Sequence, residues 1–63
     1  MKVYKFNSES EALDAQSQLN TAEGIPVENG ETQNVSDVAK YDGVWCLDYC
    51  VEAEALFGEP EII

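Results

Sequence analysis

The chain has very little positive charge, and this shortage excludes several classes of function. Its 63 residues include three lysines, no arginine and no histidine against thirteen acidic residues, so the net charge is −10. Such a chain repels phosphate backbones and anionic lipid surfaces, which argues against direct binding to nucleic acid or membranes. Without histidine, neither a Ser–His nor a Cys–His nucleophile–base pair can form. We therefore expect a protein that is not an enzyme.

Long apolar runs are also missing. No stretch approaches the roughly 18 apolar residues that a membrane-spanning helix needs. Lys2 and Lys5 make a basic start, but Asn7, Ser8 and Glu9 stand where the apolar core of a signal peptide would follow. We therefore expect an intracellular protein with its two cysteines reduced.

The length is sufficient for one small domain only. A chain of this size buries roughly 60% of the surface that it exposes when unfolded, and many such domains gain stability by association. The apolar fraction of 44% still argues for a folded chain. We expect a single α+β domain over residues 1–58, followed by an acidic C-terminal tail over residues 59–63.

The first half of the chain predicts a strand and then a helix. Lys2–Phe6 has the β-branched and aromatic content of a short strand. Ser8 and Glu11 have the spacing of a capping box, which starts a helix, while Gly24 and Pro26 are typical of residues that follow one. The apolar side of this helix is expected to carry Ala12, Leu13, Ala15, Gln16, Leu19 and Ala22.

The second half predicts a hairpin and a shorter helix. Asp42-Gly43 is the strongest hairpin signal, because both residues adopt positive φ at low cost. The expected segments are a turn over Val27–Asn34, a strand or a helical turn over Val35–Tyr41, a strand over Val44–Tyr49, and a short helix from Val51 that Gly58 ends. The predicted order is β-α-β-β-α, with a two- or three-stranded antiparallel sheet packed on one main helix.

The segment VWCLDYC, residues 44–50, contains both cysteines and is the first place to look for a metal or redox centre. On a strand, Cys46 and Cys50 would lie roughly 13 Å apart, too far to share a disulfide or an ion. A zinc site would need further Cys or His ligands that the chain lacks. We expect core thiols, with Cys50 the more exposed, and no metal or other cofactor.

A calcium site is the remaining metal hypothesis. Oxygen ligands are available on the loop residues Glu28, Asn29, Glu31, Asn34 and Asp37. They lack the order of an EF-hand loop, so a solvated turn is the preferred interpretation.

The candidate binding residues are two aromatics and four glutamates. Trp45 and Tyr49 share one face of the expected strand with Leu47, and this face is either core or an exposed recognition patch, since Trp and Tyr are enriched at interfaces. The acidic C-terminal residues Glu52, Glu54, Glu59 and Glu61 are either a solvated surface or an imitation of nucleic-acid charge that occupies a basic protein cleft.

Five segments in order, YKF, EALDAQ, EGIP, DGVW and LFGEP, resemble small uncharacterised proteins of tailed bacteriophages and prophages. The segment NVSDVAK departs from that pattern. The resemblance implies no activity and no site residues. It implies either a small virion or assembly component, or an early protein that blocks a host factor. It accordingly implies a location in the cytoplasm of a bacterial host cell or in the virion.

The leading hypothesis is a non-enzymatic phage- or prophage-type protein that acts by binding an unidentified protein partner, including a further copy of itself in a homo-oligomer. The alternative is an acidic nucleic-acid mimic that inhibits a DNA- or RNA-binding host protein. Salt separates the two, because mimicry weakens steeply with ionic strength whereas an apolar or strand-pairing interface persists.

Overall fold

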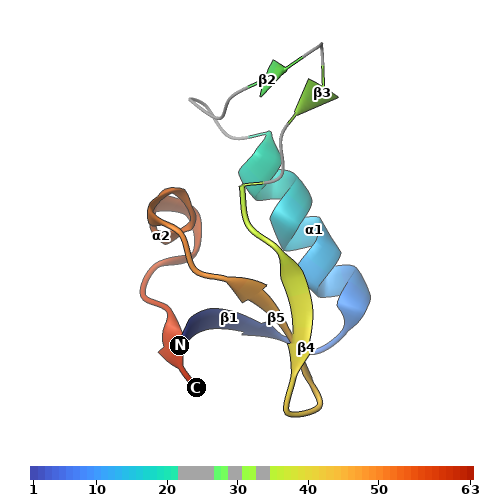
Figure 1. Cartoon of the computed structure of the whole chain (residues 1–63), viewed down its shortest axis with the longest axis vertical. Helices are drawn as coiled ribbons and strands as arrows, with labels where there is room; N and C mark the ends of the chain where they lie inside the picture. The colour runs from blue at the N-terminus through green and yellow to red at the C-terminus, as the bar shows by residue number, and fades with distance from the viewer. Residues whose placement is uncertain (22–26, 29–30, 33–34) are drawn as a thin grey trace.

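The computed structural model describes residues 1–21, 27–28, 31–32 and 35–63, with the backbone alone at 27–28 and 31–32. Its elements are β1 (Lys2–Phe6), α1 (Glu9–Asn20), β2 (Val27–Glu28), β3 (Glu31–Thr32), β4 (Val38–Tyr41), β5 (Val44–Asp48), α2 (Val51–Phe57) and β6 (Glu61–Ile62) (Figure 1). The predicted α+β class is confirmed.

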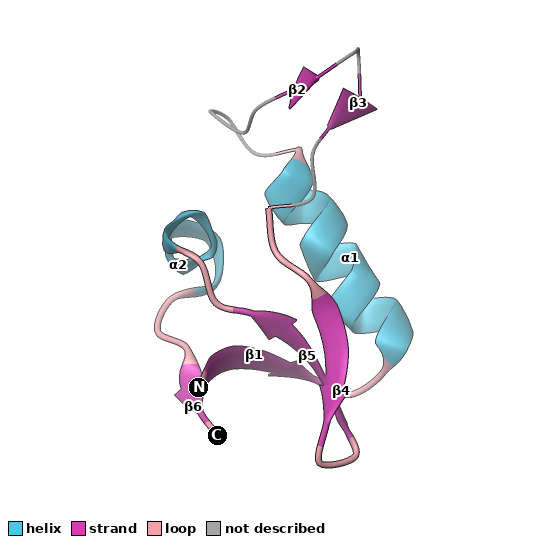
Figure 2. Cartoon of the chain, viewed as in Figure 1, coloured by secondary structure: helices cyan, strands magenta, loops and turns pink. Residues whose placement is uncertain are grey.

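Strands of the described residues form one antiparallel sheet in the order β4-β5-β1-β6 and a separate pair, β2-β3 (Figure 2). This differs from the predicted β-α-β-β-α order with two or three strands. The largest difference concerns residues 59–63, which were expected as a tail. They contain β6, where Glu61 pairs with Val3 of β1. Two residues are too short for a strand signal in the sequence, so only the pairing reveals β6.

Helix α1 begins as the sequence predicts. The Ser8 hydroxyl accepts a hydrogen bond from the backbone N–H of Glu11 at 3.2 Å, and the Glu11 carboxylate accepts one from the Asn7 N–H at 3.0 Å. The first bond satisfies a donor in the first turn of the helix, as predicted. The second differs from a capping box, because Glu11 accepts from the residue before the N-cap and not from Ser8 itself. The helix ends at Asn20. Ala22, expected on the helix, and Gly24 and Pro26, expected to follow it, lie outside the described part of the chain. Within the described residues, no helix combines the length and the apolar character that a membrane crossing requires.

The main core cluster lies on one face of the sheet, and both helices pack against that face. Val3 and Cys46, on the opposite face, are also completely buried. Tyr4 of β1 and Leu47 of β5 form one buried cluster with Ala15 and Leu19 of α1 and Ala53 of α2. Small alanines allow the helices to approach the sheet closely, and the larger leucine side chains fill the space between. The prediction of one main helix is therefore incomplete, because α2 also contributes to the core.

The hairpin between β4 and β5 is confirmed. Asp42 has φ 53° and Gly43 has φ 80°, the positive values that a tight two-residue hairpin turn requires. Tyr41 pairs with Val44 directly across this turn. The segment 35–41, which the sequence left open between strand and helix, is a bend followed by strand β4. The segment Val27–Asn34, expected as a turn, contains the paired two-residue strands β2 and β3, and its residues 29–30 and 33–34 lie outside the described part of the chain.

Candidate protein-binding site

Strand β4 is an outer strand of the sheet, and half of its backbone groups point away from it. The Asp48 N–H donates to the Asp37 carbonyl at 3.0 Å, which fixes Asp37 as a residue bonded towards β5. In an antiparallel ladder such residues alternate along the strand. Val38 and Lys40 therefore direct their N–H and C=O groups outward, where β4 has no neighbour among the described strands.

The segment that leads into β4 is fixed by side-chain hydrogen bonds. The Gln16 amide of α1 donates to the Ser36 carbonyl at 2.9 Å, and the Val35 N–H donates to the Asn20 side chain at 3.1 Å. The buried Ser36 hydroxyl donates to the Asp48 carbonyl of β5. These bonds explain why polar Gln16 lies beside the apolar side of the helix. They also hold the outer strand in place before any partner arrives.

Trp45, predicted either as core or as a binding residue, is half-buried on β5. Its strand neighbour Lys40 places its ammonium 5.7 Å from the indole ring centroid, within the range of a cation–π interaction. Leu47, two residues further on, is completely buried. The face is therefore divided: Leu47 belongs to the core, whereas Trp45 keeps part of its ring at the surface beside the outer strand.

Tyr49, the second predicted aromatic, is held by contacts within the molecule. It is half-buried against the core cluster, and its hydroxyl donates to the Glu54 carboxylate of α2 at 2.5 Å. The Lys2 ammonium lies 5.1 Å from its ring centroid. The hydrogen bond to Glu54, together with partial burial, raises the pKa of Tyr49 to about 12. This residue joins the end of β5 to α2.

The four predicted glutamates are exposed and lie on two different parts of the fold. Glu52 and Glu54 lie on α2, and Glu54 is engaged with Tyr49. Glu59 and Glu61 follow the helix and lie beside β1, where Glu61 is paired with the Lys5 ammonium at 3.5 Å. The structure therefore divides the predicted acidic region between a helix and the edge of the sheet.

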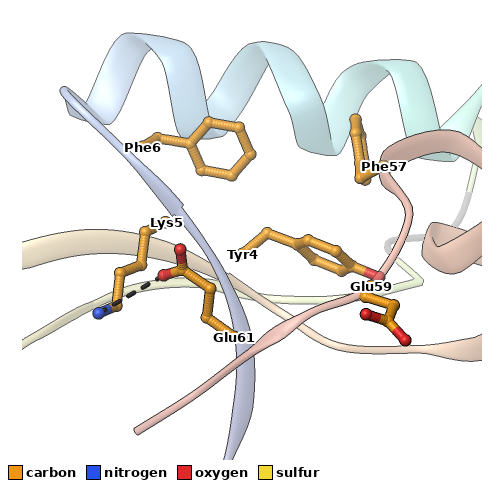
Figure 3. Close-up of a pocket in the computed structure, with 6 residues that line it drawn as sticks. All are labelled: Tyr4, Lys5, Phe6, Phe57, Glu59 and Glu61. Carbon is orange, nitrogen blue, oxygen red and sulfur yellow. Dashed lines mark ion pairs between the residues drawn. The ribbon is translucent and has the colours of Figure 1, made fainter.

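Glu59 and Glu61 belong to an open pocket of about 290 Å³ at the β1–β6 edge of the sheet (Figure 3). Its lining consists of Tyr4, Lys5, Phe6, Phe57, Glu59 and Glu61. The sequence indicated the two glutamates but not the three aromatic residues. Phe57 stands just before the helix-ending Gly58, yet nothing local shows that it meets β1. That meeting depends on pairing between the two ends of the chain.

The cysteines lie where core thiols were expected. Cys46 on β5 is completely buried, and Cys50 at the start of α2 is half-buried. Both are free thiols. Burial raises the pKa of the Cys50 thiol and disfavours the reactive thiolate. In the described residues, no group of three or more Cys, Asp or Glu side chains is placed to hold a metal ion, and Asn29 and Asn34 of the calcium hypothesis lie outside them.

No protein-family model, no curated protein and no solved structure matches the chain. Its chemistry must therefore be inferred from its own geometry. The two features suited to recognition are the outward backbone groups of β4 and the aromatic pocket at the other edge of the sheet.

Proposed function

We propose that this protein acts by binding another protein, an extended segment of which pairs with β4 as an added strand. The observation that carries the proposal is the outward N–H and C=O groups of Val38 and Lys40 on an outer strand. An added strand satisfies such groups with main-chain hydrogen bonds, and its alternate side chains then provide specificity. The half-buried Trp45 lies beside this edge and supplies an aromatic contact.

The partner segment is expected to be basic. The chain carries a net charge of −10, so an approaching basic segment is attracted and a further copy of this chain is repelled. Charge therefore favours a different protein over self-association through this edge. The phage or prophage setting of the proposal, and its choice between an assembly component and a blocker of a host factor, are supported by the sequence resemblance alone.

The alternative of a nucleic-acid mimic has less support. A mimic needs a continuous array of free carboxylates, but Glu54 is bonded to Tyr49 and Glu61 is paired with Lys5. The mimic hypothesis stays a prediction that salt dependence tests. A partner captured through Coulombic attraction alone is released at high salt, whereas main-chain hydrogen bonds keep a paired strand in place.

The experiment begins with capture of partners from a bacterial lysate at low and high salt, followed by measurement of hydrogen exchange in the purified complex. Strand addition predicts slower exchange of the Val38 and Lys40 amides. Lys40→Pro is the decisive variant, because proline removes an outward N–H while leaving the bonds to β5 intact, a position that sheets tolerate. We expect it to fold and to lose at least about tenfold in affinity, since each main-chain bond contributes roughly 1 kcal/mol and the ring also blocks close approach.

Lys40→Gln is the matched control, because it removes the same charge and keeps the N–H. It should retain affinity within about threefold, the effect of one exposed charge. Equal binding by Lys40→Pro and the unchanged protein would contradict strand addition at β4. If the protein forms a concentration-dependent dimer and Lys40→Pro abolishes it, the partner at β4 is a further copy of the chain and not a different protein.

A further inference from the structure

We infer that the pocket beside β1, defined by Tyr4, Lys5, Phe6, Phe57, Glu59 and Glu61, binds a lysine or arginine side chain of a basic protein segment. This is a different site from the β4 edge, because β4 and β6 are at opposite ends of the sheet order. The inference therefore goes beyond the proposed strand pairing and can be tested separately from it.

The first observation is the arrangement of aromatic rings. The Tyr4 and Phe57 centroids lie 5.4 Å apart with ring planes tilted by 58°, and the Phe6 and Phe57 centroids lie 6.4 Å apart with planes at 84°. Three rings in different planes present walls that face different directions (Figure 3). Aromatic walls of this kind attract cations through the negative faces of their rings.

The rings are held in position by their elements. The Tyr4 hydroxyl donates to the Gly58 carbonyl at 2.9 Å, which ties β1 to the end of α2, where Phe57 is the last helical residue. Tyr4 is almost completely buried, while Phe6 and Phe57 are half-buried and keep part of their surface open. The pocket is therefore formed before a ligand binds, which reduces the ordering cost of association.

The second observation is the charge at the rim. Glu59 and Glu61 are exposed, and the Glu61 carboxylate already holds the Lys5 ammonium at 3.5 Å. The two side chains of this ion pair are 43% and 59% exposed, so the pair is weak and open to exchange with solvent or ligand. Lys5 thus shows the kind of group that this rim accepts, and it competes with an incoming cation for Glu61.

Size and the course of the backbone favour a single side chain. A volume of about 290 Å³ lies at the lower limit of small-molecule pockets, roughly 300–1,000 Å³. The pairing of β6 with β1 covers Lys2 and Val3 and stops before Lys5, and the pocket opens at this point. An arginine suits it best, since its planar group stacks on an aromatic ring while donating to a carboxylate.

The test uses four pentapeptides, Gly-Gly-X-Gly-Gly, with arginine, lysine, citrulline or glutamate at the centre. Their glycine flanks add little to strand pairing, so the central side chain decides the result. Titration of the isotope-labelled protein followed by amide NMR should show shifts at Lys5, Phe6, Phe57 and Gly58. We expect the arginine and lysine peptides to bind at least fivefold more tightly than the citrulline peptide, which lacks the charge, and the glutamate peptide most weakly.

Variants of the rim identify the site. The double variant Glu59→Gln with Glu61→Gln should lower the affinity for the arginine peptide about fivefold to tenfold. Its matched control, Glu9→Gln with Asp14→Asn, makes the same change in net charge at exposed carboxylates elsewhere and should alter affinity by less than twofold. Lys5→Gln should strengthen binding about threefold, because it removes the competing cation and releases Glu61.

Three results would overturn the inference. The first is equal affinity for the arginine and citrulline peptides. The second is an equal loss of affinity in the rim and control double variants, which would show that only the net charge of the protein matters. The third is a set of shifts confined to residues outside the pocket. Lys40→Pro should bind the arginine peptide with unchanged affinity. If the arginine peptide binds this variant normally, and Lys40→Pro and the unchanged protein also bind the captured partner equally, the proposed function is overturned and the pocket is retained.

Discussion

The two edges of the main sheet differ in what they leave open. At β4 the backbone is open: Val38 and Lys40 present unshared main-chain groups, and the half-buried ring of Trp45 lies on the neighbouring strand. At the other edge, β6 covers the first part of β1, and beyond it an aromatic and acidic pocket lies open. The first edge suits recognition of a main chain, and the second suits recognition of one side chain.

The difference has a local cause at each edge. The Asp42-Gly43 turn returns the chain so closely that β4 and β5 pair along the whole length of β4. At the other edge α2 ends at Gly58, whose N–H donates to the Glu54 carbonyl at 2.9 Å. Residues 59 and 60 lead into β6, which first pairs through Glu61 with Val3 and then runs towards Met1. The Lys5 end of β1 is therefore not covered by β6.

The largest expected effect on stability comes from a change in the core of β5, the strand that joins the two edges. Leu47 is completely buried in β5, which pairs with β4 on one side and β1 on the other. Leu47→Ala should lower the free energy of unfolding by about 3 kcal/mol, because it removes apolar contacts and leaves a cavity. Urea denaturation followed by Trp45 fluorescence measures this. The control Val51→Ala, at a side chain that is 76% exposed, should change stability by less than about 0.5 kcal/mol.

Gly58→Ala should affect the pocket edge selectively. Gly58 has φ 81° and ψ −150°, a conformation that is essentially confined to glycine. A Cβ there would meet no atom within 4 Å, so the cost is backbone strain alone, about 2 kcal/mol. Amide NMR should place the largest shifts around Phe57 and β6. Shifts concentrated at β4 would contradict the assignment of this glycine to the pocket edge.

Gly43→Ala is the corresponding change at the β4 edge, with a smaller cost. Its φ of 80° lies in the left-handed region, and a Cβ would again meet no atom within 4 Å. The expected loss is about 1 kcal/mol, typical of a residue other than glycine in that region. Thermal unfolding measures the loss, and hydrogen exchange should increase at β4 more than at β1. Equal increases at both edges would show that the edges are not independent.

The sequence predicts those parts of the fold that depend on neighbouring residues. Ser8 caps the helix as expected, and Asp42-Gly43 forms the expected turn, because each is specified within four residues. The short helix also ends at Gly58 as predicted. In contrast, Val35–Tyr41 was ambiguous because its apolar spacing fits both periods, and its pairing with β5 decides the outcome in favour of a strand.

The candidate site shows the same limit. Trp45, Glu59 and Glu61 could be selected from the sequence by residue type. The aromatic walls that give the glutamates a chemical context could not, since Tyr4 and Phe57 are brought together only when the two ends of the chain pair. The sequence also did not reveal how deeply each residue is buried. Leu47 and Trp45 share a face of one strand, but only Leu47 is covered completely.

Alkaline pH should weaken the contact that joins β5 to α2. The hydrogen bond to Glu54 raises the pKa of Tyr49 to about 12, above its ordinary value near 10. A group whose pKa is higher in the folded state stabilises the fold fully below its unfolded value and loses this contribution as pH rises. Stability should therefore fall between about pH 10 and 12. In Tyr49→Phe that decline should be smaller, as urea denaturation across this pH range would show. If stability declines equally in Tyr49→Phe and in the unchanged protein, the decline belongs to other tyrosines.

The smallest expected effect on stability comes from Lys5→Gln. This change also tests most directly whether Lys5 has a structural role at the pocket edge. Its ion pair with Glu61 joins two exposed side chains, so its loss should alter the free energy of unfolding by less than about 0.5 kcal/mol. Thermal unfolding in low and high salt measures this. An ion pair of such small value contributes little to holding β6 on β1, since main-chain bonds between Met1 and Ile63 already join the strands. A loss above about 1 kcal/mol would instead make Lys5 a structural residue of this edge and remove it as a competitor for a cationic ligand.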